Sequence, residues 1–337
     1  MKALAWQRGL EFKIEGIPEP SAEPGRVVVR VEAAAICGTD LHTADFGITG
    51  PLVLGHEVAG VVHEIGDDAG GLAVGDRVAL DPVQVCGACW PCLNGMAHLC
   101  GNCRHLGYLD TAGGWAEYVA IDAANAHEIP AAVDFASACL AEPMAVCYES
   151  FQRAGLKEED AVLIIGDGPF GFLHAQIARA MGAGQIVVAG HYDKRLARIS
   201  QATGAISCNT HHEDLAGVLA GEIGSPGADI VIEATGAGAS ANIGLKALRP
   251  RGTIVVFSYV WEPEPLDMAL VHMRELNVLG SCRSLNAYKK CLDLMGQGQV
   301  DTGLLVDLQV PLEDYSTALD KLLNHKEDIF KAVFILP

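Results

Sequence analysis

The chain has 337 residues, half of them hydrophobic and 19% charged, so it is long enough to bury two cores and too apolar to be disordered. Its formal net charge of −19 at pH 7 argues against sequence-independent binding to nucleic acids or to anionic membranes. No apolar run reaches the roughly 18 residues of a membrane span, and no apolar segment with a cleavage site opens the sequence. We therefore expect a cytoplasmic protein whose partners include neither nucleic acid nor membrane.

The first part of the chain, up to about residue 144, consists of short β-rich runs broken by glycine and proline. Examples are the runs at 25–38, 52–66 and 75–83. Short strands with frequent turn residues predict a compact barrel.

From about residue 160 the pattern changes to apolar strands that alternate with helices. The predicted strands lie at 161–166, 185–190, 228–236 and 252–258. Near-continuous apolar strands separated by helices predict a parallel sheet that is covered on both faces. The tail after about residue 285 either extends this sheet or returns to the first domain, and periodicity alone leaves both open.

Four cysteines lie close together in VCGACWPCLNGMAHLC. Cys86, Cys89, Cys92 and Cys100 have the spacing C-x2-C-x2-C-x7-C, with glycines between them that let the chain turn. Four thiolates complete a tetrahedral shell with no open position, which favours a structural zinc site. The alternatives are an iron–sulfur cluster, whose spacings usually differ, and four unliganded thiols.

A second group of metal-binding residue types lies upstream, in ICGTDLH and LGHEVAG. Cys37 offers a thiolate, His56 an imidazole and Glu57 a carboxylate. With water in the fourth position, such a set makes an open, Lewis-acidic zinc site. The pattern alone is weak, because a lone cysteine and a distant His-Glu pair are more often ordinary core and surface residues.

The third motif is the glycine-rich segment VLIIGDGPFGFLHAQIARAMGA. Gly166, Gly168 and Gly171 stand in G-x-G-x-x-G register after an apolar strand and before a helix, and Pro169 suits the first helical turn. The glycines permit a tight turn and a close approach of backbone to ligand, so the amino terminus of the helix faces a pyrophosphate. We expect Phe170 to belong to the same dinucleotide site.

Together these motifs resemble the zinc-dependent medium-chain alcohol dehydrogenases, within them the branch of sorbitol, threonine and related polyol dehydrogenases. The resemblance spans essentially the whole chain and also rests on GGWAEYV, LAEPMAV and IEATG. It implies an α/β protein with a GroES-like β-barrel catalytic domain that carries the zinc lobe (1–144). A Rossmann NAD(P)-binding domain with a doubly wound parallel sheet (145–284) and a return to the catalytic domain (285–337) follow. It also implies a homo-oligomer, a dimer or a tetramer.

The resemblance assigns metal-binding roles to individual residues. Cys37 and His56 match the catalytic zinc ligands, and Glu57 matches an adjacent glutamate that ligates the metal in some states. Glu142, in LAEPMAV, stands where the polyol branch has a glutamate and the ethanol-oxidising branch a cysteine ligand. A carboxylate there can ligate directly or hold a zinc-bound water.

The resemblance also implies a reaction, hydride transfer between a metal-bound secondary alcohol or polyol and the nicotinamide. Thr39 matches the residue that accepts the alcohol proton and His42 the one that passes it outward; a turn cap and a surface histidine are their structural alternatives. Arg283 stands where sorbitol-type enzymes have an arginine near the substrate, although a surface ion pair explains it nearly as well. The family's tyrosine after DLH is absent, and we expect Phe46 to line the pocket.

The choice of coenzyme depends on Gly190, at the end of the predicted strand 185–190. NAD-preferring relatives have an acidic residue there that binds the ribose hydroxyls. Its absence removes repulsion of a 2′-phosphate and leaves room for one, and His191, Lys194 and Arg195 offer donors or positive charge. We therefore expect NADP ahead of NAD.

A zinc-free relative, such as a quinone reductase-like redox protein or a dinucleotide-binding protein, is the alternative. Zinc-free branches lack both the cysteine lobe and the Cys/His pair, and this chain retains both. We favour a zinc enzyme with a small alcohol or carbonyl substrate.

Overall fold

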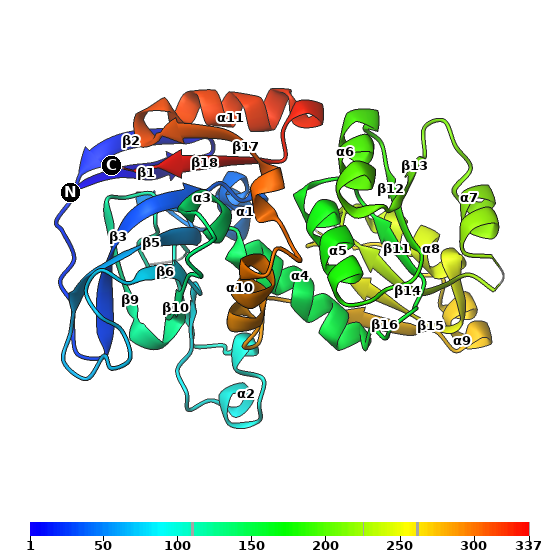
Figure 1. Ribbon diagram of the computed structural model, residues 1–337, viewed down its shortest axis with the longest axis horizontal. Helices are drawn as coiled ribbons and strands as arrows, with labels where there is room; N and C mark the ends of the chain where they lie inside the picture. Colours follow the sequence, from blue (N-terminus) through cyan, green and yellow to red (C-terminus); the bar gives the residue numbers. More distant parts are fainter. Residues whose placement is uncertain (109–110, 225, 261–262, 337) are drawn as a thin grey trace. The chain divides into compact units, whose positions relative to one another are not determined.

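The structure is a computed structural model that describes residues 1–108, 111–224, 226–260 and 263–336. Two compact units are present: unit 1 comprises Met1–Pro143 and Tyr288–Pro337, and unit 2 comprises Met144–Ala287. Figure 1 labels their elements. The strands are β1 (Lys2–Arg8), β2 (Glu11–Gly16), β3 (Arg26–Ala35), β4 (Leu52–Val53), β5 (Glu57–Ile65), β6 (Arg77–Leu80), β7 (Val83–Gln84), β8 (Arg104–His105), β9 (Tyr118–Asp122), β10 (Ala126–Glu128), β11 (Val162–Ile165), β12 (Ile186–Gly190), β13 (Ile206–Asn209), β14 (Ala228–Glu233), β15 (Leu248–Val256), β16 (Asn277–Gly280), β17 (Val306–Pro311) and β18 (Lys331–Ile335). The α-helices are α1 (Gly38–Leu41), α2 (Trp90–Leu93), α3 (Phe135–Ala138), α4 (Ala141–Ala154), α5 (Pro169–Ala180), α6 (Asp193–Thr203), α7 (Leu215–Glu222), α8 (Gly238–Ala247), α9 (Met268–Arg274), α10 (Tyr288–Gly296) and α11 (Tyr315–Asn324).

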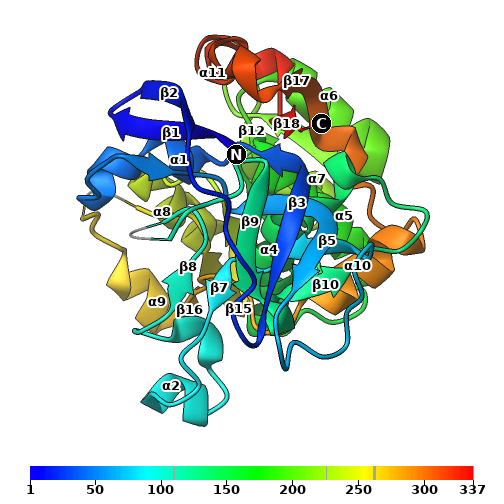
Figure 2. The ribbon, with the colours of Figure 1, turned by 90° about the vertical axis from the view of Figure 1, so that its left-hand side faces the viewer.

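Unit 1 is built around β3, a strand rich in β-branched valines and buried along most of its length. It lies in a seven-stranded sheet of order β10-β6-β5-β3-β18-β17, and β9 also pairs with it. Figure 2 shows β9, β3 and β5 side by side. The carboxy-terminal strand β18 pairs antiparallel with β3, so the tail of the chain contributes a strand to this sheet. Trp115 packs edge-on against Phe334 in the core, with ring centroids 5.3 Å apart.

Unit 2 contains a six-stranded sheet of order β13-β12-β11-β14-β15-β16, and every neighbouring pair is parallel. In chain order this is 3-2-1-4-5-6, the arrangement of a dinucleotide-binding fold. Helices α5 and α6 lie on one face and α8 on the other (Figure 1). The predicted fold class, a β-barrel with a doubly wound parallel sheet, is confirmed. None of the described helices is long and apolar enough to span a bilayer.

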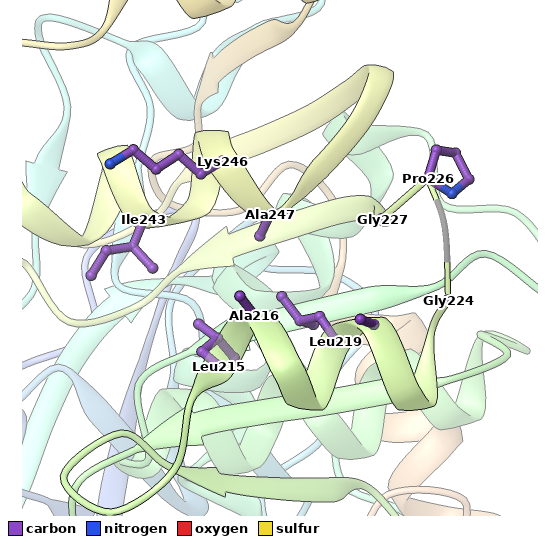
Figure 3. A pocket seen from close by; sticks show the side chains of 10 residues that line it. Leu215, Ala216, Leu219, Gly224, Pro226, Gly227, Ile243, Lys246 and Ala247 are labelled. Carbon is purple, nitrogen blue, oxygen red and sulfur yellow. The ribbon is translucent and has the colours of Figure 1, made fainter.

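An apolar cavity of about 400 Å³ lies in unit 2 between α7 and α8 (Figure 3). Leu215, Leu219 and Ile243 line it, and Lys246 is the charged side chain among its described lining residues. These residue types offer neither metal ligands nor an acid–base pair, and the cavity includes none of the predicted site residues. The candidate site is therefore built elsewhere.

His174 is a titratable group in the core of unit 2 and is fully buried on α5. Its Nδ1 lies 2.7 Å from the carbonyl oxygen of Phe170, and its Nε2 lies 3.0 Å from the hydroxyl of Ser150. The rings of Phe151 and Phe257 pack edge-on against it. Burial lowers the pKa of His174 to about 4, so the imidazole is neutral in the folded protein at pH 7.

This lowered pKa predicts a loss of stability in mild acid. Below the unfolded pKa, about 6.5, the unfolded chain binds a proton that folded His174 does not bind, so the free energy of unfolding falls by about 2 kcal/mol between pH 7.5 and 5. His174→Gln should show a smaller loss than the wild type when urea unfolding at pH 7.5 and pH 5 is compared. Equal losses in the two proteins would contradict the prediction, since other titrating groups are shared.

Candidate functional site

The four cysteines of the lobe come together in unit 1. Cys89 caps the short helix α2, and Gly87 and Gly95 turn the chain with φ of +68° and +73°. The sulfur atoms lie within 4.8 Å of one another, and three pairs are 3.4, 3.5 and 3.6 Å apart. A tetrahedral zinc with Zn–S bonds of about 2.3 Å requires sulfurs about 3.8 Å apart. The lobe thus has the geometry to hold such an ion, and it extends away from the sheet strands of unit 1 (Figure 2).

The lobe favours a thiolate at one of its four cysteines, whereas burial raises the pKa of another, Cys92, to about 12. Hydrogen bonds from the backbone amides of Ala88 and Cys89 are the main cause that lowers the pKa of Cys86 to about 6. A thiolate, not a thiol, is the metal ligand. Cys103 lies outside the group of four.

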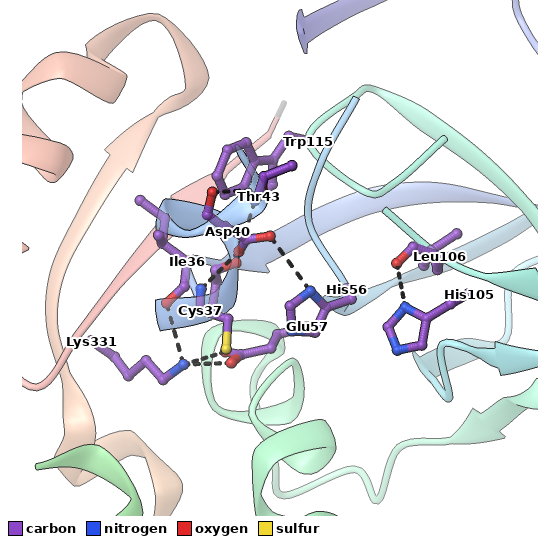
Figure 4. Close-up of polar contacts among 11 residues, drawn as sticks. Ile36, Cys37, Asp40, Thr43, His56, Glu57, His105, Leu106, Trp115 and Lys331 are labelled. Atoms are coloured by element: carbon purple, nitrogen blue, oxygen red, sulfur yellow. Dashed lines mark hydrogen bonds and ion pairs between the residues drawn. The ribbon is translucent and has the colours of Figure 1, made fainter. Parts of the chain in front are cut away.

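The second group forms where β3 and β5 lie side by side. In the antiparallel register of these strands, Ala35 stands opposite Glu57. Cys37 follows the end of β3 and His56 precedes the start of β5, so the pairing brings their side chains together (Figure 4). The ligand atoms of Cys37, His56 and Glu57 lie within 4.8 Å of one another, and all three residues are buried. Residues distant in sequence therefore form one potential metal site.

Two further residues, Asp40 and Lys331, support this group. Asp40 is buried; its Oδ2 accepts a hydrogen bond of 2.8 Å from the amide of Cys37, and its Oδ1 lies 3.5 Å from Nδ1 of His56. Lys331 Nζ donates to both carboxylate oxygens of Glu57, at 2.7 Å for Oε2, and to the carbonyl of Ile36 at 3.2 Å. Neither residue was among those predicted from the sequence motifs. The signal for Lys331 was a lone lysine in the apolar strand KAVFILP.

The charges in this group balance one another. Burial lowers the pKa of Lys331, but Glu57 and Cys37 together outweigh that effect and raise the pKa, so the ammonium stays charged. Burial likewise lowers the pKa of His56, and Asp40 and Cys37 outweigh that effect and leave it well above its ordinary value. A buried charge is tolerated only with a close partner of opposite sign. Each cationic side chain of the site, Lys331 and His56, therefore lies close to an anionic partner.

Glu142 lies in the first turn of α4 and belongs to unit 1. Burial raises its pKa to about 7; His56 acts in the opposite direction and Glu57 adds to the increase. Its carboxylate is thus close enough to His56 and Glu57 for their charges to change its pKa. Within the described residues, however, Glu142 is not among the side chains whose ligand atoms gather within 4.8 Å.

The predicted proton-transfer residues follow Cys37 in the chain, one on α1 and one directly after it. Thr39 is exposed, two residues beyond Cys37. His42 follows the helix and is exposed, with its Nδ1 2.8 Å from Oδ2 of Asp45. Phe46 ends the 3-10 helix Thr43–Phe46, and its side chain lies outside the described part of the structure.

In unit 2 the glycine motif forms the turn between β11 and α5. Gly166 has φ of +129°, and a Cβ on Gly171 would lie 1.9 Å from the carbonyl oxygen of Gly166, so only glycine allows this close turn. Gly168 is the N-cap of α5 and Pro169 is its first residue. Proline suits this position because the first amides of a helix have no partner within the helix. The other free amides of the first turn can bind an anion. Phe170 packs edge-on against Phe257. The turn lies at the carboxyl ends of β11 and β14, where strand order reverses and such folds bind dinucleotides.

Gly190 ends β12 as expected, but the space beside it is not open. A Cβ on Gly190 would lie 2.4 Å from Cβ of Asp167 and 2.5 Å from its Oδ2. The side chain of Asp167, from the glycine loop, therefore occupies the space directly beside Gly190, which the glycine motif alone did not indicate.

The three predicted donors follow Gly190 directly. His191 and Lys194 are exposed, and Arg195 is partly buried with its guanidinium 5.2 Å from the ring centroid of Tyr192. The predicted substrate arginine, Arg283, is partly buried in unit 2 after β16, with φ of +60°.

Comparison with protein families gives two matches. Residues 23–131 match the alcohol dehydrogenase GroES-like domain, and residues 169–297 match the zinc-binding dehydrogenase domain. Together they span more than half of the chain. The first match covers Cys37, His56 and the cysteine lobe, and the second begins at Pro169 in the glycine loop.

Two curated relatives align over nearly the whole chain. An L-threonine 3-dehydrogenase from Bacillus velezensis is 34% identical over 96% of this chain and 94% of its own length. A sorbitol dehydrogenase from Bacillus subtilis is 29% identical over 99% of this chain and 96% of its own length.

Solved structures share the fold along the whole chain. A putative zinc-binding dehydrogenase from Sinorhizobium meliloti 1021, bound to NADP, has a TM-score of 0.92 at 29% identity and covers 99% of both chains. A short chain alcohol dehydrogenase from Escherichia coli CFT073, complexed with NADH, has a TM-score of 0.92 at 26% identity and covers 100% of this chain and 99% of its own. With the thiol lobe, the Cys/His/Glu group and the glycine turn, these similarities show that the chain belongs to the zinc-dependent medium-chain alcohol dehydrogenases, in their polyol dehydrogenase-like branch, and uses zinc and a nicotinamide coenzyme.

Proposed function

We propose that the protein transfers hydride between a secondary alcohol or polyol and NAD(P) at a metal held by Cys37, His56 and Glu57, with Glu142 beside it. The observation that carries this proposal is the convergence of Cys37, His56 and Glu57 where β3 and β5 pair. A thiolate, an imidazole and a carboxylate with room for a fourth ligand are typical of a catalytic rather than a structural zinc.

When bound, zinc would lower the pKa of an alcohol, and a nicotinamide coenzyme would accept the hydride. Cys37 would bind the metal through Sγ and His56 through Nε2, because Asp40 faces Nδ1 and fixes the orientation of the ring. Thr39 accepts the alcohol proton, and His42, exposed on the same short segment, passes it to solvent. Lys331 balances the charge of Glu57, and Glu142 can exchange a proton near neutral pH because its pKa is about 7.

The lobe has a different role in this proposal. Cys86, Cys89, Cys92 and Cys100 supply four sulfurs to one ion and leave no position for a substrate. We assign them to a structural zinc that fixes the loop between β7 and β8.

We assign the coenzyme to the Rossmann domain, residues 145–284, and the metals to the catalytic domain, residues 1–144 with the return at 285–337. The glycine turn and the amino terminus of α5 offer backbone amides to the pyrophosphate. Contacts come from Gly166, Gly168, Pro169, Phe170 and Gly171 and from the segment Gly190, His191, Lys194 and Arg195 after β12.

The substrate class follows from the relatives. Curated matches include sorbitol dehydrogenase from Bacillus subtilis and L-threonine 3-dehydrogenase from Bacillus velezensis, which supports a substrate with a secondary alcohol and further polar groups. Phe46 and Arg283 are the side chains we propose to select it.

We propose a homo-oligomer, a dimer or a tetramer, in the cytoplasm. Strand β16 is an edge strand of its sheet, and an unpaired strand edge offers backbone hydrogen-bonding groups to a second copy of the chain. The thiolate lobe requires reduced cysteines, which the cytoplasm maintains.

The structural zinc is tested by Cys92→Ser. Loss of one thiolate should remove about one zinc per chain and lower the melting temperature, because the ion closes the lobe. Cys103→Ser is the matched control, since Cys103 is nearby but outside the group of four. Metal analysis and thermal melting that leave Cys92→Ser unchanged would refute the structural zinc.

The catalytic metal is tested by Cys37→Ala and His56→Ala. Each should reduce kcat/KM at least about a thousandfold, since the alcohol loses its Lewis acid, while NAD(P)H titration gives Kd values close to the wild type. Glu142→Ala should lower turnover with a milder loss of metal. Cys291→Ala, which removes a buried thiol of unit 1 outside the group of potential metal ligands, should stay active. Full activity in Cys37→Ala would overturn the mechanism.

The substrate class is tested by a screen of the purified protein with both coenzymes. Polyols such as sorbitol and xylitol should be oxidised with higher kcat/KM than primary alcohols such as ethanol, because extra hydroxyls bind polar groups in the pocket. Arg283→Ala should raise KM for polyols more than for simple secondary alcohols. A preference for primary alcohols would sink the polyol proposal.

A further inference from the structure

The carboxyl end of β12 and the glycine loop fit together through a pair of residues, Gly190 and Asp167. Dinucleotide-binding folds commonly have an acidic residue at the end of this second strand, where it binds the ribose hydroxyls. Here the strand ends in glycine, and a Cβ at that position would lie 2.4 Å from Cβ and 2.5 Å from both Cγ and Oδ2 of Asp167. The side chain of Asp167 thus fills the volume in which a side chain on residue 190 would begin.

The Asp167 side chain is held in place by the segment that follows β12. Its Oδ2 accepts hydrogen bonds of 2.7 Å from the amides of both His191 and Tyr192. The residue is only 7% exposed. Charge-assisted hydrogen bonds from two backbone amides fix a carboxylate far more firmly than solvent does, so this group has one defined position.

The two hydrogen bonds leave part of the carboxylate available. Among the described residues, both bonds go to Oδ2, and a carboxylate oxygen can accept from more than one donor. Oδ1 can therefore accept a hydrogen bond from a ligand hydroxyl. The acidic residue at the end of the second strand has this role in other dinucleotide-binding domains.

We propose that Asp167 takes over, from the glycine loop, the coenzyme-selecting function of the acidic residue that β12 lacks. The ribose hydroxyls of NAD(H) donate to its carboxylate, whereas a 2′-phosphate meets its negative charge. This inference depends on the proposed function only in that the coenzyme binds at this turn. It revises the role of Gly190: the glycine makes room for a carboxylate, not for a phosphate.

Positively charged groups nearby favour binding of a 2′-phosphate, which is opposite to the effect proposed for Asp167. His191 and Lys194 are exposed, and Arg195 lies over the ring of Tyr192. These residues attract a 2′-phosphate while Asp167 repels it. The ratio of NADPH to NADH affinity is therefore the quantity that Asp167 controls.

Asp167→Asn tests the proposal, because asparagine keeps an oxygen that accepts from both amides and removes the charge. Titration of the purified holoprotein with NADH and with NADPH, without substrate, gives the two Kd values by fluorescence. We expect the affinity ratio to shift at least about tenfold toward NADPH, as loss of a charged hydrogen-bond acceptor and of a like-charge contact implies. A ratio that stays within about threefold of the wild type, with both coenzymes bound, would show that Asp167 only fixes the loop.

Asp193→Asn is the matched control. Asp193 is exposed at the start of α6, and its Oδ1 accepts a hydrogen bond from Asn209 rather than from the amides after β12. It should change the ratio much less than Asp167→Asn. An equal shift in both variants would assign the effect to net charge and overturn the proposal.

A charge-relocating double variant keeps the test decisive if Asp167→Asn folds poorly. Asp167→Gly with Gly190→Asp moves the carboxylate to β12 and removes the overlap that Gly190→Asp alone would create. It should restore a ratio close to the wild type, whereas Asp167→Gly alone should favour NADPH. A double variant that still matches Asp167→Gly would refute the selecting role of this carboxylate. Failure of the wild type to bind either coenzyme would instead overturn the proposed function, and this inference with it.

Discussion

The antiparallel pairing of β3 with β5 is the constraint on which the site of unit 1 depends. The register that sets Ala35 opposite Glu57 places Cys37 next to His56 and Glu57. Because successive side chains of a strand point to opposite faces, a shift of one residue would turn Glu57 away from the group. The hydrophobic faces of both strands hold this register, so the packing of the barrel core also determines the geometry of the metal ligands.

Charge matching is what makes this buried arrangement tolerable. Glu57 and Lys331 come from strands on either side of β3, and β18 therefore contributes the lysine that pairs with the buried Glu57. Removal of Lys331 alone would leave a buried carboxylate without its partner, which costs more than the pair contributes. The carboxy-terminal strand thus has a part in the site as well as in the sheet.

The sequence predicted local features well, because their chemistry is contained in short motifs. The spacing of the four cysteines and the G-x-G-x-x-G register both correspond to the geometry seen here. Asp40 and Asp167 lie inside motifs and Lys331 lies outside them, but the contacts with His56, with the amides after β12 and with Glu57 join distant segments, which the spacing of a motif does not show. Gly190 illustrates the difference: its position at the end of β12 was predicted correctly, but the residue that occupies the space beside it comes from another loop.

The location of Asp167 also has a physical logic in a chain with a net charge of −19. The field of the whole molecule repels an anionic coenzyme, so binding must rely on local donors such as the amides at the amino terminus of α5. A further carboxylate at the coenzyme turn is tolerable only when its charge is partly neutralised in place. The amides of His191 and Tyr192 do this for one oxygen of Asp167. The electrostatic interaction of the remaining charge falls with distance. It is strong at the ribose, where it distinguishes a hydroxyl from a phosphate. At the pyrophosphate it is weak and leaves binding intact.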